Sequence, residues 1–380
     1  MIYFDNAATT RVSSLAAERA LYYMTELYAN PSSAHAFGFE AEKALRMARA
    51  QLLSALGFSA SEGTLLFTSG GTEADNLALR GVAHARARRG KHIVISNSEH
   101  PAVENTARAL EQEGFSVSRL STQGGALNEE EIRATLRPDT ILVSCMAVNN
   151  ETGAVYDIDT LARLTHALCP NAAFHTDAVQ GFTKIPSSVW KHAGLVSVSS
   201  HKIHAPKGAG ALFVRKGIRL VPMLTGGGQE GDIRPGTEAL PTLCAFGAAA
   251  EAAMKGFSEE AAAVSQLNAY LRTRLSEMDG VILNTGTRSV SPHILSIAVP
   301  GLRSEIMLRF LSARQIYVSA GSACSSKHAD NRVLSAFGLS DALADSTLRL
   351  SFSADNTCEE ADEFLSALTE GMKTLIHTGA

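Results

Sequence analysis

The chain has 380 residues, of which 45% are hydrophobic, and its formal net charge is −4 at pH 7. This length accommodates one large domain and a smaller one. Lysine and arginine cluster only within residues 86–91, so no basic surface is available for nucleic acid. There is no signal-peptide pattern and no apolar run of the ~20 residues that span a bilayer, so no membrane partner is expected. Five scattered cysteines without a CxxC pair predict a reducing cytoplasm and no metal site.

Short apolar runs alternate with helical patterns from about residue 65 to residue 215. Such alternation predicts a mostly parallel sheet covered by helices. The predicted strands are Thr64–Phe67, His92–Ser96, Ile141–Val148, Ala172–His175, Leu195–Ser199 and Ala211–Val214. The helical stretches between them include Glu73–Arg88, Pro101–Gln112 and Asp159–Leu168.

The C-terminal third has a different pattern. An alanine-rich helical stretch, Pro241–Met278, breaks near Gly256 and leads to short strands at His293–Ala298, Ile316–Ser319 and Thr347–Phe352, followed by a helix at Glu359–Ile376. This order predicts a smaller α+β domain. We expect a large domain over residues 16–255 and a small domain formed by residues 1–15 and 256–380.

Polar side chains follow several predicted strands at the edge where open α/β sheets bind ligands. Asp177 closes one strand and Lys202 comes just after another. A lysine amine can form a Schiff base with the aldehyde of pyridoxal phosphate, and a carboxylate can pair with the pyridinium nitrogen of that cofactor. The pair therefore predicts pyridoxal phosphate and chemistry at the Cα atom of an amino acid.

Three other motifs allow two interpretations each. The turn Thr68–Thr72 opens a helix and could hold a phosphate, but without Lys202 an ordinary helix cap would be the favoured interpretation. His100 could stack on a cofactor ring or be a surface histidine. Arg349, inside an apolar strand, could grip a substrate carboxylate or form a structural salt bridge.

Cys324 differs from the other four cysteines in its surroundings. It lies among small residues, Ser319-Ala-Gly-Ser-Ala-Cys-Ser-Ser-Lys327, which predicts an exposed, mobile loop. Cys145 and Cys244 lie in apolar stretches and are expected to be buried and inert. Cys324 is therefore either a nucleophile that moves between reaction partners or an incidental loop cysteine.

The motifs together resemble those of the NifS/IscS-like cysteine desulfurases, class-V aminotransferases with the fold-type I, aspartate-aminotransferase-like architecture. The resemblance runs nearly end to end. Its motifs are Asp5-Asn-Ala-Ala-Thr-Thr10, Asn30-Pro-Ser-Ser33, Thr68-Ser-Gly-Gly-Thr-Glu-Ala-Asp-Asn76, Ser98-Glu-His-Pro101, Val148-Asn-Asn-Glu-Thr-Gly153, Asp177-Ala-Val-Gln180, Ser200-His-Lys202, Gly226-Gly-Gly-Gln-Glu230, Arg234-Pro-Gly-Thr237 and Gly321-Ser-Ala-Cys-Ser325.

The resemblance implies a role for each matching residue. Lys202, Cys324 and His100 are implied to be catalytic: Lys202 holds the cofactor and removes the Cα proton, and Cys324 takes sulfur from L-cysteine as a persulfide, leaving L-alanine. Asp177, Gln180 and His100 contact the cofactor ring, and Asn30, Asn150 and Arg349 bind substrate, Asn150 also lying at the cofactor. Phosphate contacts are implied for Gly71, Thr72, Ser199, His201 and, from the neighbouring subunit of a homodimer, Thr237.

Other possibilities stay open. A selenocysteine lyase or another aminotransferase-like enzyme would share most motifs, and Cys324 distinguishes these from a desulfurase. A non-catalytic sulfur-carrier module on the same fold would not need Lys202, Asp177, His100 and Arg349 together. The chain ends soon after its last helix, whereas members of the family often extend further to dock a scaffold. The acceptor protein for the sulfur, in iron–sulfur assembly or in tRNA or cofactor thiolation, is therefore open.

Overall fold

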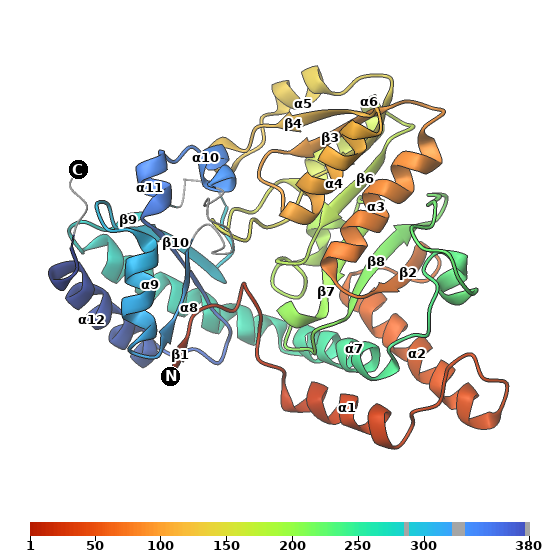
Figure 1. The fold of residues 1–380 in the computed structure, drawn as a ribbon, viewed down its shortest axis with the longest axis horizontal. Helices are drawn as coiled ribbons and strands as arrows, with labels where there is room; N and C mark the ends of the chain where they lie inside the picture. Colours follow the sequence, from red (N-terminus) through yellow and green to blue (C-terminus); the bar gives the residue numbers. More distant parts are fainter. Residues whose placement is uncertain (285–288, 321–330, 377–380) are drawn as a thin grey trace.

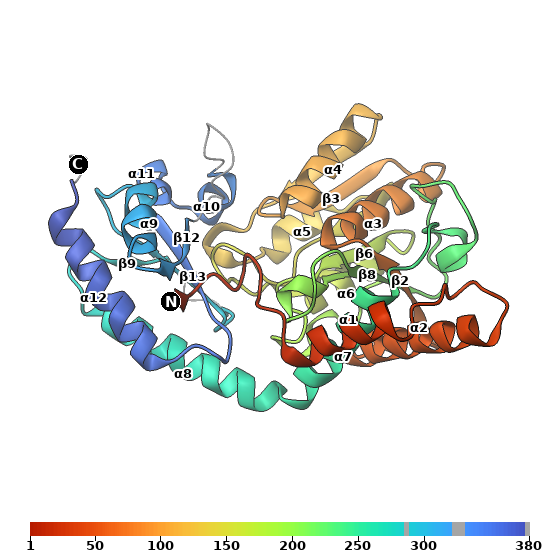
Figure 2. The ribbon, with the colours of Figure 1, turned by 60° about the horizontal axis from the view of Figure 1, so that its bottom comes forward.

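A computed structural model describes residues 1–284, 289–320 and 331–376. Two lobes lie side by side, joined below by the long helices α7 (Leu240–Lys255) and α8 (Phe257–Ser276), as Figure 1 and Figure 2 show. The larger lobe contains a seven-stranded sheet and the smaller lobe a four-stranded one. The boundary expected between residues 255 and 256 falls where α7 gives way to α8.

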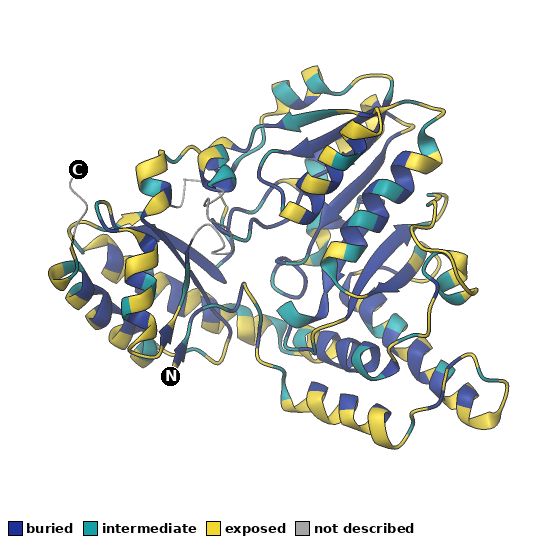
Figure 3. Cartoon of the chain, viewed as in Figure 1, coloured by how far each residue is buried: buried dark blue, intermediate teal, exposed yellow. Residues whose placement is uncertain are grey.

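The seven-stranded sheet has the order β2-β8-β7-β6-β5-β3-β4, and β8 runs antiparallel to both of its neighbours while the other pairs are parallel. The carboxyl ends of β2, β3, β5, β6 and β7 therefore share one edge. Every residue of β3, β5, β6 and β7 is buried (Figure 3), as expected for strands covered on both faces. The strands are β2 (Gly63–Thr68), β3 (His92–Ser96), β4 (Ser116–Leu120), β5 (Thr140–Ser144), β6 (Ala173–Asp177), β7 (Leu195–Ser199) and β8 (Gly210–Arg215).

Helices cover both faces of this sheet. Leucines and alanines of α3 (Gly71–Arg86) and α4 (Pro101–Gln112) pack on one face, and α2, α6 and α7 pack on the other. Pro101 suits the first turn of α4 because it has no N–H to satisfy, and His100 caps that helix by accepting from the Ala102 N–H. The remaining helices of this lobe are α1 (Ser14–Thr25), α2 (Ala36–Ala55), α5 (Glu129–Thr135) and α6 (Ile158–Leu168).

The smaller lobe has an antiparallel sheet of order β12-β13-β10-β9. Helices α8, α9 and α12 contribute apolar side chains such as Leu271, Met307 and Phe364 to its core. A capping box formed by Thr357 and Glu360 starts α12. The elements are β9 (Ile282–Leu283), β10 (Ile294–Ala298), β12 (Ser319–Ala320), β13 (Thr347–Ser351), α9 (Ser304–Ser312), α10 (Arg332–Phe337), α11 (Asp341–Asp345) and α12 (Cys358–Thr374).

The N-terminal segment connects the two lobes. Strand β1 (Ile2–Tyr3) pairs in parallel with β11 (Ile316–Tyr317) in the smaller lobe. Further along, the Ala7 N–H donates to the Ser351 hydroxyl at 2.8 Å, and the Thr10 N–H donates to the carbonyl of His201 at 2.9 Å. Residues 5–10 therefore lie against both lobes.

Most of the predicted elements are present, but some differ. The strand predicted to run to Val148 ends at Ser144, because the Met146 N–H donates to a Glu99 carboxylate oxygen instead of continuing the ladder with β3. Helices α1 and α2 and the half-exposed edge strand β4 were not predicted. The mostly parallel large sheet and the α+β smaller lobe are confirmed. No helix in the described part of the chain is long and apolar enough to cross a membrane.

Phe4 anchors the N-terminal segment, and removal of its ring should lower the free energy of unfolding. Its fully buried ring makes edge contacts with Phe352 and Phe364 at centroid distances of 5.2 and 6.1 Å. Phe4→Ala leaves a cavity, so the free energy of unfolding in a denaturant titration should fall by ~3–5 kcal/mol. Ile376→Ala, at a position 84% exposed, should change it by less than ~0.5 kcal/mol. Equal losses in the two variants would contradict this anchoring role.

Candidate active site

A cavity of 330 Å³ opens at the shared carboxyl edge of the large sheet, between the two lobes. It gathers side chains from five strand ends and from β13 of the smaller lobe, as expected for an open α/β sheet. Of the residues predicted to form the site, those that line the cavity are Gly71, Thr72, His100, Asn150, Asp177, Gln180, Ser199, His201, Lys202 and Arg349.

Three predicted residues do not line this cavity or cannot be placed. Asn30 is exposed and accepts the Ser32 N–H at 2.9 Å in its own turn. Thr237 is exposed, at the end of a segment that follows Gly226. Cys324 lies outside the described residues.

Lys202 is held by backbone carbonyls of the N-terminal segment. It closes a short 3₁₀ turn after β7, and its amine donates to the carbonyls of Ala7 at 2.5 Å and Ala8 at 2.8 Å. Burial and the charge of Arg349 lower the pKa of Lys202, and Asp177 and Asp5 oppose the shift, so that the pKa is about 8. A substantial fraction of this amine is therefore neutral near physiological pH, unlike an ordinary lysine.

Asp177 supplies a buried negative charge at the end of β6. One carboxylate oxygen accepts the Val179 N–H at 2.8 Å. Burial raises the pKa of this carboxyl, while His100 and Lys202 act to lower it. A carboxyl in this setting is stabilised as an anion when a cation binds next to it. Asp177 thus suits a protonated ring nitrogen.

His100 has one ring nitrogen committed to the fold. Its Nδ1 accepts the Ala102 N–H at 3.1 Å, so the proton of the neutral ring lies on Nε2. Burial lowers the pKa of His100, with Lys202 and Arg332 adding to the shift and Asp177 opposing it. A neutral imidazole in a cavity wall can stack on a flat ring and offer its Nε2–H.

Arg349 is paired in the structure, as the structural interpretation of this residue required. Its guanidinium donates to Asp5 at 2.9 Å and to the carbonyl of Asn150 at 3.0 Å. The buried Nε has no hydrogen-bond partner among the described residues. The side chain also lines the cavity, so a substrate carboxylate can add to this cluster or compete with Asp5. Both interpretations are therefore compatible with the geometry.

The start of α3 and the end of β7 provide hydrogen-bond donors. The first N–H groups of a helix have no partner within it and attract anions. Gly71 stands there because a Cβ atom at this position would come within 2.9 Å of Val179 Cγ2. Ser199 and His201 approach from β7, and the pKa of His201 is lowered to about 4 by burial and nearby lysines, so its ring is neutral.

Gln180 faces the same space with half of its amide unpaired. Its Nε2 donates to the carbonyl of Ala7 at 2.9 Å, whereas the buried Oε1 has no hydrogen-bond partner among the described residues. A buried amide oxygen without a donor is costly. A hydroxyl group on a bound ligand would satisfy it.

Two ion pairs fasten the segment before Thr237, one to the start of α3 and the other to α2. Arg234 pairs with Glu73 at 2.8 Å, and Glu73 also accepts the Ser69 N–H. Glu230 accepts from the guanidinium of Arg49 at 2.7 Å and from the Phe67 N–H at 2.9 Å. The exposed Thr237 is therefore presented by a segment that is tied to the loop at the end of β2.

Three of the four described cysteines, Cys145, Cys169 and Cys244, are poor nucleophiles. Cys145, Cys169 and Cys244 are buried, as expected for Cys145 and Cys244. Burial raises the pKa of each thiol, to about 12 for Cys244. Cys358, which is partly exposed, begins α12.

Several site residues escaped the sequence analysis. Asp5 had no visible link to Arg349, and the carbonyls of Ala7 and Ala8 carry no side-chain signal. Asp75 on α3 also lines the cavity, and its buried Oδ1 lacks a hydrogen-bond partner among the described residues. The family motif Asp5–Thr10 was the sequence signal that this segment matters, although no chemical role was assigned to its residues.

The residues of the cavity fit pyridoxal phosphate. They offer an amine with a lowered pKa, a buried carboxylate for a ring cation, an unpaired amide oxygen for a ring hydroxyl, and donors at a helix start for a phosphate.

Comparison with known proteins agrees with this geometry. The model of the family described as aminotransferase class-V matches residues 2–364. The chain belongs to the class-V aminotransferase family. Members of this family are pyridoxal phosphate enzymes, and the fold-type I architecture predicted from the sequence is confirmed.

The relatives place this class-V aminotransferase in the NifS/IscS-like cysteine desulfurase group. It is 40% identical to a NifS/IcsS protein homolog of Lactobacillus delbrueckii subsp. bulgaricus, with 97% of each chain covered. It is 37% identical to the cysteine desulfurase IscS of Methanosarcina thermophila, covering 98% of this chain and 92% of that one. A solved NifS-like protein superposes with a TM-score of 0.92 at 35% identity, covering 98% and 100%. A structure titled SspA in complex with cysteine superposes with a TM-score of 0.80 at 31% identity, covering 94% and 100%.

The lowered pKa of Lys202 predicts how fast the apoenzyme of this class-V aminotransferase takes up pyridoxal phosphate. Uptake requires the neutral amine, so the rate should rise with pH, reach half its maximum near the Lys202 pKa of about 8, and level off above it. Stopped-flow absorbance measures the rate, with Lys202→Ala as the background. A rate still climbing at a pH of ~10, where an ordinary lysine titrates, would contradict the assigned environment.

Proposed function

We propose that this protein is a cysteine desulfurase that moves the sulfur of L-cysteine onto Cys324 and releases L-alanine. The observation that carries the proposal is the Lys202 amine, with its lowered pKa, facing the same cavity as the buried Asp177 carboxylate. Membership of the NifS/IscS-like group supports the choice of reaction within the family.

The cofactor proposed for the cavity is pyridoxal phosphate. Lys202 would hold its aldehyde, Asp177 its ring nitrogen, Gln180 its ring hydroxyl and His100 its ring face. The phosphate group would be bound by Gly71, Thr72, Ser199, His201 and Thr237. When bound, the cofactor supplies an electron-withdrawing ring that stabilises negative charge at the substrate Cα.

The substrate is held by its carboxylate and loses a proton to Lys202. Arg349 orients the carboxylate, with Asn150 beside it in the cavity wall. Asn30 is assigned to substrate binding only through the family motif, since it is outside the cavity. Lys202, neutral in part at pH 7–8, takes the Cα proton as a general base. His100 can exchange a proton with the substrate through Nε2.

Cys324 is proposed to receive the sulfur. Its thiolate attacks the substrate sulfur, a sulfur–sulfur bond forms, and the bond between Cβ and sulfur breaks with its electron pair remaining on carbon. Protonation of that carbon completes L-alanine, so cysteine and an enzyme thiol become alanine and an enzyme persulfide. The pKa values of Cys145, Cys169 and Cys244 are raised by burial, which disfavours these thiols for the role.

The proposed partners are an acceptor protein for the persulfide sulfur and a second copy of this chain. The exposed position of Thr237, on a segment tied to the cofactor cavity, supports its use in the site of a neighbouring subunit. Free cysteines in the described part of the chain support a reducing, cytoplasmic setting.

Replacing the proposed sulfur acceptor tests the function directly. In Cys324→Ala, the rate of alanine formation from L-cysteine should fall by ~100-fold or more, because the nucleophile is lost. The purified protein should keep the yellow colour of the bound cofactor. Cys358→Ala, at a partly exposed thiol, should keep both. Alanine production at the wild-type rate by Cys324→Ala would refute the persulfide step.

Mixed dimers test the proposed position of Thr237. A Thr237→Val homodimer should bind the cofactor with ~10-fold lower affinity, because one hydrogen bond to a charged phosphate is lost. A heterodimer of Thr237→Val with Lys202→Ala has one site with an intact lysine and an intact threonine from the neighbouring subunit, so it should bind one cofactor tightly. Weak binding at that site would show that Thr237 acts within its own chain.

A further inference from the structure

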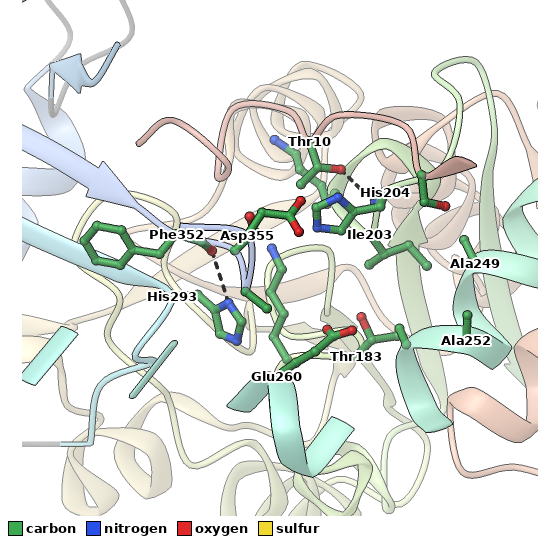
Figure 4. Close-up of a pocket in the computed structure, with 16 residues that line it drawn as sticks. Thr10, Thr183, Ile203, His204, Ala249, Ala252, Glu260, His293, Phe352 and Asp355 are labelled. Atoms are coloured by element: carbon green, nitrogen blue, oxygen red, sulfur yellow. Dashed lines mark hydrogen bonds between the residues drawn. The ribbon is translucent and has the colours of Figure 1, made fainter. Parts of the chain in front are cut away.

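A second cavity, of 220 Å³, shares Lys202 with the first. It lies where α7 and α8 meet the segments after β6 and β13 (Figure 4). Glu260, Ala354 and Asp355 on its lining are exposed, so the cavity communicates with solvent at that side. A space of this size, lined in part by polar side chains, holds several water molecules. Lys202 therefore borders the cofactor cavity and a water-accessible one.

Lys184 projects a second amine into this cavity. Its side chain is half-buried, and the amine makes no hydrogen bond or ion pair with the described residues. Burial lowers the pKa of Lys184 to about 7, with the charges of Lys202 and Arg349 acting in the same direction. Such an amine both accepts and releases a proton near neutral pH.

The histidines of the cavity cannot replace Lys184 in holding a proton. His204 donates its Nδ1–H to the carbonyl of Arg11 at 2.9 Å, and His293 donates its Nδ1–H to the carbonyl of Phe352 at 3.3 Å (Figure 4 draws the second bond). Burial lowers the pKa of both rings, to about 3 for His293. Both rings are thus neutral at pH 7.

Carboxylates complete the electrostatic surroundings of Lys184. Burial and the charge of Asp355 raise the pKa of Glu260. In Figure 4, Glu260 reaches up from α8 beside Thr183, and Asp355 lies opposite it, near His204. The charged and titratable groups around Lys184 are Lys202, Arg349, Glu260 and Asp355, with the imidazoles of His201, His204 and His293. The charge of Lys202 lowers the pKa of Lys184, so the two amines interact across this space.

We propose that Lys184 is a positioning residue that transfers protons from Lys202 to the water of this second cavity. The inference rests on the proposed function, in which Lys202 removes the Cα proton. One N–H bond of the Lys202 ammonium breaks and an N–H bond forms on the neutral Lys184 amine. Lys184 then gives the proton to water, and no electrons are transferred between groups.

The position of the two cavities explains the need for this route. Cofactor and substrate fill the first cavity during the reaction, so water reaches Lys202 from the second. Without Lys184, the proton removed from substrate stays on Lys202 longer and returns to carbon more often. The isotope content of the alanine measures the competition between return of this proton to carbon and its loss to water.

Deuterium retention measures the route. The wild-type holoenzyme is given L-cysteine deuterated at Cα in ordinary water, and mass spectrometry gives the fraction of alanine that keeps deuterium. Lys184→Met removes the amine, and Lys184→Arg carries a permanent charge and cannot accept a proton at neutral pH. Both should raise the retained fraction by about two-fold or more, whereas Lys207→Met, at an exposed lysine outside the cavity, should match the wild type.

Cofactor uptake by the apoenzymes provides a second readout that does not depend on turnover. A permanent charge at position 184 should lower the Lys202 pKa, so the uptake midpoint of Lys184→Arg should fall by about one pH unit. Lys184→Met should keep the wild-type midpoint, because Lys184 is already mostly neutral when Lys202 titrates.

The outcomes separate this proposal from the proposed function. Unchanged deuterium retention in both Lys184 variants, or an unchanged uptake midpoint in Lys184→Arg, would overturn the role of Lys184 while leaving desulfuration intact. No alanine from the wild type would overturn the proposed function instead. Lys184→Gln replaces Lys184→Met should the latter not fold.

Discussion

The hydrogen bonds from Lys202 to the carbonyls of Ala7 and Ala8 are the constraint on which the site depends. They join a lysine at the end of β7 to a segment 195 and 194 positions earlier in the chain. The same segment contacts the smaller lobe through Ser351 and through the pair of Asp5 with Arg349. Position and protonation of the amine are therefore set by both lobes together.

Two carboxylates of the cavity, those of Asp177 and Asp5, lie opposite a cationic side chain. Asp177 faces His100 and Lys202, and Asp5 faces Arg349. Isolated ions at these depths would be strongly destabilising, and removal of one partner leaves the other uncompensated. A site that is half cationic and half anionic also suits an amino acid, which carries both charges, better than a simple anion.

The sequence predicted those parts of the fold that depend on local pattern. Strands β3 and β7 have the predicted bounds, and α4 begins at the predicted Pro101. Lys202 and Asp177 were placed correctly at strand ends, since that edge follows from sheet topology alone. Contacts between backbone and distant side chains were missed, as for Ala7 with Lys202, because a carbonyl leaves no mark in the residue type. Lys184 was missed because burial, not sequence, makes it unlike a surface lysine.

One measurement tests the central claim, that the Lys202 amine is the covalent attachment point of the cofactor. Borohydride would reduce a Schiff base to a stable secondary amine, and peptide mapping by mass spectrometry would locate the label. The account predicts a single pyridoxyl group on the peptide that contains Lys202, and none in Lys202→Ala. Label on another lysine, or none in a protein that has been given cofactor, would contradict it.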